Sequence, residues 1–301
     1  MGTSTTSSQG RLLVCATPIG NASDITQRVV EALDSASAIY AEDTRVTRKL
    51  LQMLGIDATV IRCDENATER VIPQIVSRVE DGQTVAFVSD AGMPCISDPG
   101  QRVVAALRER GLAVEVLPGA SAVTTAVAGS GFVGSSFYFG GFFPRKAGER
   151  RRLLESLATL DAMLVFYESN HRTVSALRAI DEVLPKRRVC MARELTKVHE
   201  EYAVDFPGAL ADSIEARGGE LRGEVVLVIE PPSKGEGSVP AADAAAVSTD
   251  APLEETLAKA AEELSVQEGM GSSKIAKELQ RRFGIPREQA YEVARSCKKK
   301  A

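Results

Sequence analysis

The sequence predicts an α/β fold made of two α/β domains and a small helical appendage. Over most of the 301 residues, short β-prone runs alternate with segments whose apolar residues recur at helical spacing. Hydrophobic residues make up 44% of the chain, enough to bury a core in each domain. A stretch rich in Pro, Gly, Ser and Ala then precedes a C-terminal segment with a purely helical pattern. Strands separated by helices indicate a largely parallel sheet with helices on its faces.

The N-terminal α/β domain is expected over residues 11–120. Its predicted strands are RLLVCA (11–16), ASAIYA (36–41), TVAFVS (84–89) and AVEVLP (113–118). Ser23 and Asp24 indicate the start of its first helix, and Asp98 before Pro99 is expected to cap another. The polar residues 1–10 are expected to form a disordered tail.

The C-terminal α/β domain is expected over residues 121–231. Its predicted strands are FYFGGFF (137–143), AMLVFYES (162–169), RRVCMAREL (187–195) and GEVVLVIEP (223–231). Helical patterns occupy residues 149–158 and 171–184. Residues 232–252 have linker composition, and residues 253–301 form the helical appendage, in which two short helices flank the turn FGIP (283–286).

The net charge of −5 argues against a nucleic-acid partner, but the charge is unevenly distributed. Residues 271–301 hold nine Lys and Arg against three Glu, an excess of +6, so the rest of the chain carries about −11. A second basic cluster, residues 145–152, holds five cations and one anion. Both segments suit a polyanionic partner such as RNA, and the alternative is two solvated helix surfaces.

Several classes of protein are disfavoured. No stretch approaches the roughly 18 apolar residues of a membrane span, and the first ten residues lack the apolar core of a secretory leader. The five cysteines are widely spaced and form no C-x-x-C pair, so neither a disulfide framework nor a metal site is predicted. We expect a cytoplasmic protein without a metal.

Four sets of loops at predicted strand ends are candidates for chemistry, because functional loops of such sheets gather at the carboxyl ends of the strands. They are residues 17–21, 89–100, 117–122, and the pair 166–171 and 192–197. The loop 89–100 contains two Asp, and its glycines let a ligand approach the backbone. The first loop, TPIGN, is not a G-x-G-x-x-G motif, which disfavours a nicotinamide cofactor.

The order of these loops identifies a family resemblance. The motifs are TPIGN (17–21), AEDTR (41–45), SDAGMPCISDPG (89–100), PGAS (118–121), FYES (166–169), AREL-TK (192–197) and GEVVLVIE (223–230). Together they resemble the tetrapyrrole methylase superfamily over about residues 11–231. They are most similar to its ribosomal RNA branch, which methylates the ribose 2′-oxygen of a cytidine in 16S rRNA of the small ribosomal subunit. The porphyrin-modifying branch has a G-x-G-P-G first loop, so TPIGN favours RNA over a tetrapyrrole.

The resemblance implies a fold, a cofactor and partners. It implies two α/β domains with S-adenosylmethionine in the cleft between them, a homodimer, and a C-terminal appendage like the helical pair found here. By position, the implied cofactor-binding residues are Pro18, Asp90, Ala91, Gly92, Pro94, Ser121, Ala122, Tyr167, Leu195, Thr196, Gly223 and Val225.

Methyl transfer to a ribose hydroxyl requires alignment of the reacting atoms, and a base or a cation at the hydroxyl oxygen assists it. The candidate catalytic residues are Lys197, Glu194, Glu168, Asp43 and Arg45. Lys197 is the first choice, either as base or as a cation that stabilises the developing alkoxide. The alternative for each residue is a structural ion pair.

RNA is expected to contact the basic cluster and the C-terminal helices. The predicted RNA-binding residues are Arg145, Lys146, Arg150, Arg151 and Arg152. Two rival functions remain: a methyltransferase of the same fold that acts on a tetrapyrrole or a protein side chain, and a non-catalytic RNA-binding module.

Overall fold

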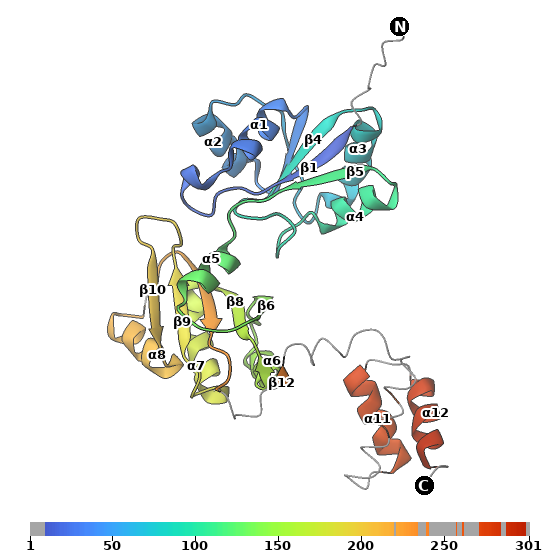
Figure 1. Ribbon diagram of the computed structural model, residues 1–301, viewed down its shortest axis with the longest axis vertical. Helices are drawn as coiled ribbons and strands as arrows, with labels where there is room; N and C mark the ends of the chain where they lie inside the picture. The colour runs from blue at the N-terminus through green and yellow to red at the C-terminus, as the bar shows by residue number, and fades with distance from the viewer. Residues whose placement is uncertain are drawn as a thin grey trace. The chain divides into compact units, whose positions relative to one another are not determined.

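The structure is a computed structural model that describes residues 10–219, 221–233, 239–240, 257, 261, 271–283 and 287–298 (Figure 1). The chain divides into two compact units, Met1–Val239 and Pro240–Ala301. Among these residues, no helix has both the length and the apolar character that a membrane crossing requires. The predicted tail at 1–9 and most of the predicted linker lie outside the described residues.

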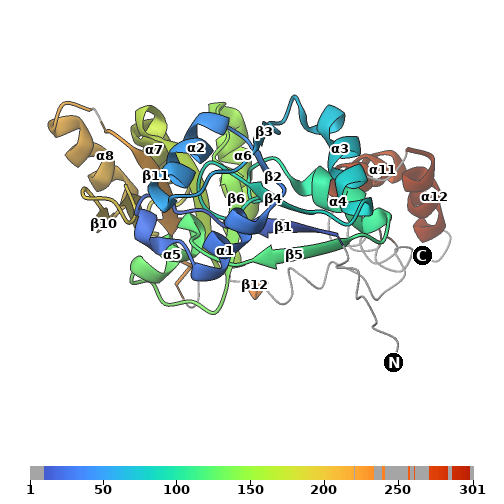
Figure 2. The ribbon, with the colours of Figure 1, turned by 90° about the horizontal axis from the view of Figure 1, so that it is seen from above.

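The first sheet of the larger unit is wholly parallel. Its strands are β1 (Arg11–Cys15), β2 (Ala38–Ala41), β3 (Val60–Arg62), β4 (Thr84–Val88) and β5 (Ala113–Leu117), in the order β3-β2-β4-β1-β5. Figure 2 shows β1 beside β5, where Arg11 pairs with Ala113 and Cys15 with Leu117. Four strands match the prediction. The sequence did not indicate β3, which is only three residues long and half-exposed at the edge.

Helices cover both faces of this sheet. They are the 3-10 turn η1 (Ala22–Asp24), α1 (Gln27–Ser35), α2 (Thr44–Leu54), α3 (Thr68–Glu80) and α4 (Gln101–Glu109). One core cluster joins the sheet to α3 and α4, and another joins its opposite face to α1 and α2. Two predicted helix starts are wrong. Thr26 caps α1 with its hydroxyl, and Gly100 precedes α4 without a side-chain cap, so Asp98 is not the cap of α4.

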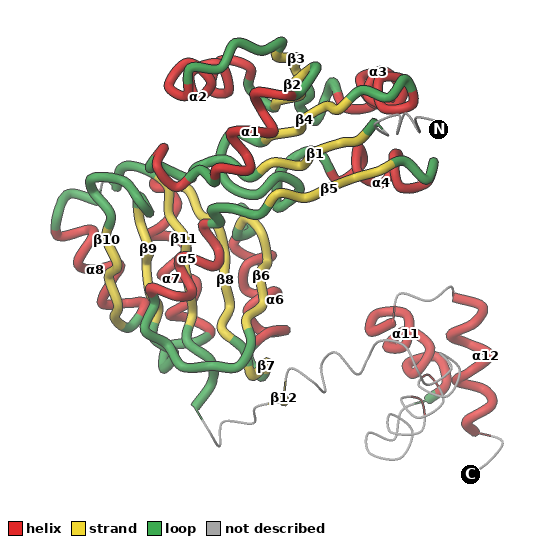
Figure 3. The backbone as a smooth tube through the Cα atoms, turned by 45° about the horizontal axis from the view of Figure 1, so that its top comes forward, coloured by secondary structure: helices red, strands yellow, loops and turns green. Residues whose placement is uncertain are grey.

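The second sheet is mixed, so the expectation of a largely parallel sheet holds only for the first one. Its strands are β6 (Phe137–Phe142), β8 (Met163–Ser169), β9 (Val189–Arg193), β10 (Glu201–Asp205) and β11 (Glu224–Ile229). In the order β10-β9-β11-β8-β6, only β6 and β8 are parallel (Figure 3). The sequence did not indicate β10. Two short strands, β7 (Leu160–Asp161) and β12 (Val239–Pro240), lie outside both five-stranded sheets.

The two faces of the second sheet differ in their cover. The helices α6 (Ala147–Leu157), α7 (Thr173–Val183), which follows the 3-10 turn η2 (Asn170–Arg172), and α8 (Pro207–Ala216) pack on one face. Among the helices that the structure describes, α5 (Ala122–Gly129) alone crosses the other face (Figure 3), and Ile19 from the loop after β1 joins the same apolar cluster. The loops of the first sheet therefore meet the uncovered end of the second sheet.

The smaller unit contains α11 (Ser272–Phe283) and α12 (Arg287–Lys298), close to the predicted bounds. The two helices pack through Ile275, Leu279, Ala290 and Ala294. The rest of the predicted appendage lies outside the described residues, apart from Leu257 and Ala261 in the same cluster.

Candidate functional site

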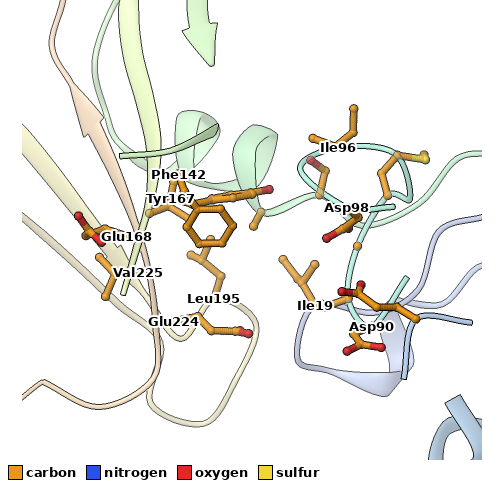
Figure 4. Close-up of a pocket in the computed structure, with 17 residues that line it drawn as sticks. Ile19, Asp90, Ile96, Asp98, Phe142, Tyr167, Glu168, Leu195, Glu224 and Val225 are labelled. Atoms are coloured by element: carbon orange, nitrogen blue, oxygen red, sulfur yellow. The ribbon is translucent and has the colours of Figure 1, made fainter. Parts of the chain in front are cut away.

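A cavity of about 290 Å³ lies where the loops after β1 and β4 face β8, β9 and β11 (Figure 4). Most of the predicted cofactor-binding residues line it: Asp90, Ala91, Gly92, Ser121, Ala122, Tyr167, Leu195 and Val225. The carboxyl ends of the first sheet and the open end of the second thus supply its walls, as the strand-end loops predicted.

The loop after β4 is held in place by the loop after β1. Gly92 and Thr17 exchange two backbone hydrogen bonds of 2.9 and 3.1 Å. Gly92 has φ of +79°, and a Cβ at this position would lie 3.2 Å from the Ile19 side chain. Because side chains other than glycine rarely adopt this conformation, the sequence SDAG places a bare backbone segment against the cavity.

One wall of the cavity is aromatic and apolar. Phe142 and Tyr167 pack edge to face with ring centroids 5.4 Å apart, next to Leu195 and Val225. Burial, assisted by Asp98, raises the pKa of Tyr167 to about 12, so its hydroxyl stays neutral. The sequence did not indicate Phe142 as a site residue, because it ends a strand, FYFGGF, in which apolar and polar residues do not alternate.

The opposite wall is acidic, as Asp90 and Asp98 show in Figure 4. Burial raises the pKa of Asp98 to about 6, with Asp90 acting in the same direction. Burial also raises the pKa of Glu42 to about 7, and the negative charges of Asp90 and Asp98 add to this effect. Sequence reasoning missed Glu42 and chose its neighbours Asp43 and Arg45 from the same AEDTR motif.

Asp43 and Arg45 do not line the cavity. The Asp43 carboxylate caps α2 by accepting from the Arg45 N–H at 2.8 Å, and it pairs with the Arg45 guanidinium at 2.5 Å. These bonds hold the pKa of Asp43 well below its usual value. The Asp43 N–H donates to Asp90 at 2.9 Å, so this residue positions an acidic side chain of the wall. The geometry favours the structural alternative for both residues.

Lys197 lies between two carboxylates beside the cavity. Its Nζ is 2.8 Å from Glu194 and 2.9 Å from Glu224, which lines the cavity. Burial lowers the pKa of Lys197, but the hydrogen bonds to Glu194 and Glu224 outweigh it, and the pKa ends above its usual value. A lysine that stays protonated is a poor base, so the raised pKa favours a stabilising cation over a base at Lys197, and the role as base stays a prediction. Its role as a stabilising cation stays a prediction.

Pro18 and Lys197 line a second cavity of about 410 Å³ that adjoins the first. The two cavities share Ile19, Asp90, Ala91 and Glu224. Between them, the Asn21 N–H donates to Thr196 Oγ1 at 3.0 Å, and a Cβ on Gly20 would lie 2.5 Å from the Lys197 side chain. The TPIGN loop therefore packs directly on the turn that carries Lys197.

The remaining predicted cofactor residues line neither cavity. Pro94 is buried within the loop after β4, and Gly223 packs against the Glu194 side chain at the start of β11. Thr196 supports the TPIGN loop through its hydroxyl.

Glu168 lines the cavity beside Tyr167, and two arginines anchor its carboxylate. Its buried carboxylate lies 2.5 Å from Arg172 and 3.7 Å from Arg150. Arg150 also donates to the Pro144 carbonyl and the Ser175 hydroxyl. Its side chain is 5% exposed. The prediction that Arg150 binds RNA is therefore wrong, because its guanidinium faces the protein interior. The geometry favours a structural role for Glu168 as well.

The other members of the basic cluster are exposed on and before α6. Lys146 pairs with Glu149 at 3.1 Å, and Arg151 pairs with Glu155 at 2.8 Å. Arg145 and Arg152 have no ion-pair partner in the part of the chain that the structure describes. The loop that carries Arg145 follows Phe142 of the cavity wall.

An acidic wall that faces an aromatic wall suits an organic cation with a flat apolar part. Comparison with known proteins identifies the family to which the chain belongs. Residues 11–209 match the family model of the tetrapyrrole (corrin/porphyrin) methylases. The chain belongs to the tetrapyrrole methylase family.

Relatives of this tetrapyrrole methylase define its branch. The ribosomal RNA small subunit methyltransferase I of Thermotoga maritima is 44% identical over 205 residues, 68% of this chain and 90% of that protein. The enzyme of the same name from Micromonospora olivasterospora is 37% identical over 286 residues, 95% of this chain and 87% of that protein. These relatives place this methylase in the ribosomal RNA branch of the family.

The solved structure of a cobalt precorrin-4 methyltransferase shares the fold. It superposes with a TM-score of 0.57 at 16% identity and covers 76% of this methylase and 98% of its own chain. Because the chain belongs to a methylase family, the alternative hypothesis of a non-catalytic RNA-binding module is disfavoured.

Proposed function

We propose that this methylase transfers the methyl group of S-adenosylmethionine to the ribose 2′-oxygen of a cytidine in 16S rRNA. The observation that carries the proposal is the identity of 37–44% to ribosomal RNA small subunit methyltransferase I proteins, which in one case extends over 95% of the chain. The TPIGN first loop supports RNA over a tetrapyrrole.

The lining of the 290 Å³ cavity supports S-adenosylmethionine binding there. S-adenosylmethionine, when bound, supplies an activated methyl group on a positively charged sulfur. The carboxylates of Glu42, Asp90 and Asp98 offer that charge a favourable field. The aromatic wall and the bare backbone at Gly92 suit a flat adenine ring, since such rings pack well on aromatic side chains.

Two side chains are proposed to act on the attacking hydroxyl. Lys197 remains charged and stabilises negative charge as it develops on the ribose oxygen. Glu42 accepts the hydroxyl proton, because a carboxylate with a pKa of about 7 is an efficient base near neutral pH. Glu194 and Glu224 hold the Lys197 ammonium in position.

The proposal is tested by the choice of acceptor. Purified protein is incubated with radiolabelled S-adenosylmethionine and, in separate reactions, 30S subunits, naked 16S rRNA and a tetrapyrrole. We expect label in one or both RNA acceptors and none in the tetrapyrrole. Label in the tetrapyrrole alone would support the rival function.

The acidic wall predicts that cofactor affinity depends on pH. Glu42 and Asp98 ionise as the pH rises through about 6 to 7, and their negative form attracts the sulfonium. S-adenosylmethionine should therefore bind roughly tenfold more tightly at about pH 8 than at about pH 5.5. S-adenosylhomocysteine lacks the sulfonium charge and is the matched control ligand. Calorimetry that gives the same pH dependence for both ligands would remove the acidic wall from cofactor recognition.

The exposed basic cluster is proposed to contact RNA phosphates through Arg145, Lys146, Arg151 and Arg152. Replacing Arg145 and Arg152 by Glu should weaken RNA binding about tenfold. It should also reduce the slope of log K against log salt concentration by about one or more, because each lost phosphate contact on single-stranded RNA lowers that slope by about 0.7. The matched control places the same charges at Arg70 and Arg110, on α3 and just after α4. Equal effects of the two double variants would mean that only net charge matters.

A homodimer in the cytoplasm is proposed on the family resemblance, since two-fold symmetry is the commonest form of soluble oligomer. Sedimentation at micromolar concentration should give a species of twice the 32.1 kDa chain mass. A single species of the chain mass would contradict the dimer.

A further inference from the structure

One side of the second cavity is formed by helix α2, which does not line the cofactor cavity. The residues Val46, Lys49, Leu50 and Met53 of α2 line it. They recur at positions i, i+3, i+4 and i+7, so they form one face of the helix, with the buried Thr47 at its border and Leu51 in the core. This face presents large apolar groups to the second cavity.

The apolar groups on this face are exposed. Val46 is 43% exposed and Met53 is 62% exposed. Lys49 has no ion-pair partner among the residues that the structure describes, although Asp90 and Glu224 line the same cavity. An apolar surface next to a cation offers a contact to each part of a nucleotide, because apolar side chains can pack on a splayed-out base and a cation can pair with its phosphate.

The position of this cavity sets the direction of approach. It shares Ile19, Asp90, Ala91 and Glu224 with the cofactor cavity, and Lys197 lies on its lining. An acceptor in the second cavity would thus place its ribose beside Lys197 and next to the cofactor cavity. The volume of about 410 Å³ falls in the range of small-ligand sites.

We propose that the α2 cavity receives the acceptor nucleotide of a single-stranded RNA segment, with Val46 and Met53 against its base and Lys49 at an adjoining phosphate. This inference rests on the proposed function and adds the binding site of the acceptor. The base is held by apolar contact, and the ribose hydroxyl then points towards the Lys197 ammonium.

The inference is tested first by kinetics. The double variant Val46→Gln, Met53→Gln should raise the KM for RNA about tenfold, leave kcat within about threefold, and leave S-adenosylmethionine affinity unchanged. The matched control is Val116→Gln, Val133→Gln, which changes two exposed valines that line neither cavity. Lys49→Gln should raise the KM and lower its salt dependence.

A measurement on the unaltered protein makes the test independent of folding defects. Hydrogen peroxide oxidises accessible methionines, and mass spectrometry reports each site. RNA substrate should slow the oxidation of Met53 at least fivefold, whereas S-adenosylmethionine alone should protect only Met93, which lines the cofactor cavity.

The outcomes separate this inference from the proposed function. Methyl transfer to rRNA by the wild type, with an unchanged KM in the double variant and no RNA protection of Met53, would overturn the nucleotide site alone. Protection of Met53 that rises with protein concentration without RNA would show that a second copy of the chain covers α2, and would also overturn it. If the wild type does not methylate rRNA, that result overturns both the proposed function and the nucleotide site.

Discussion

Lys197→Met is expected to lower methyl transfer to rRNA by about 10²–10³-fold, the usual loss when one preorganised charge-stabilising group is removed. Methionine keeps the length and the apolar stem but lacks the ammonium that lies 2.8 Å from Glu194 and 2.9 Å from Glu224. Single-turnover rates with saturating RNA report this step directly. The affinity for S-adenosylmethionine should change by less than about threefold, because Lys197 lies outside the lining of the cofactor cavity.

The control for this variant is Arg178→Met. Arg178 also bridges two carboxylates, Asp212 and Glu215, each at 2.6 Å, and it lies on α7 away from both cavities. It reports what the loss of a bridging cation does to stability alone. Equal losses of activity in the two variants, or full activity in Lys197→Met, would contradict a chemical role for Lys197.

Gly92→Val is expected to weaken S-adenosylmethionine binding by about 100-fold or more. Valine at φ of +79° is strained, which costs roughly 1–3 kcal/mol, and its Cβ would lie 3.2 Å from the Ile19 side chain at the cavity. The branched side chain also occupies the surface where the ligand meets backbone. Calorimetric titration of a variant that remains folded gives the affinity.

Gly111→Val is the matched control for that variant. Gly111 has φ of +68°, and a Cβ there would meet nothing within 4 Å. Its backbone strain is therefore similar, but it lies at the end of α4 and outside both cavities. If Gly92→Val binds the cofactor as tightly as Gly111→Val does, the SDAG loop is not part of the binding site.

The sequence predicted the sheets well because their strands are buried and apolar. Runs such as VAFV in β4 and MLVF in β8 are hydrophobic throughout, and turn residues mark their ends. The edge strands β3 and β10 were missed because half-exposed strands have little apolar signal. Three of the motifs, TPIGN, SDAGMPCISDPG and PGAS, directly follow strands, and residues from each of them line the cavity proposed for the cofactor or the second cavity that adjoins it.

The roles of individual charged residues were harder to predict. Glu42 and Asp43 are adjacent in sequence, yet one lines the cavity and the other caps a helix. Asp98 precedes Pro99 as a helix cap would, but α4 begins only at Gln101. Arg150 belongs to a basic run, and helical periodicity turns it inward to Glu168 while its neighbours face solvent. Such choices depend on tertiary contacts that a single sequence does not display.

The central claim, methyl transfer to a ribose oxygen of rRNA, is tested most directly by nucleoside analysis of the product. Small subunits from cells that lack this activity are incubated with the protein and S-adenosylmethionine, and the 16S rRNA is digested to nucleosides for mass spectrometry. We expect 2′-O-methylcytidine at one position, dependent on Lys197 and abolished by Gly92→Val. Methylation on a base, or no methylation of RNA by a protein that binds S-adenosylmethionine, would contradict it.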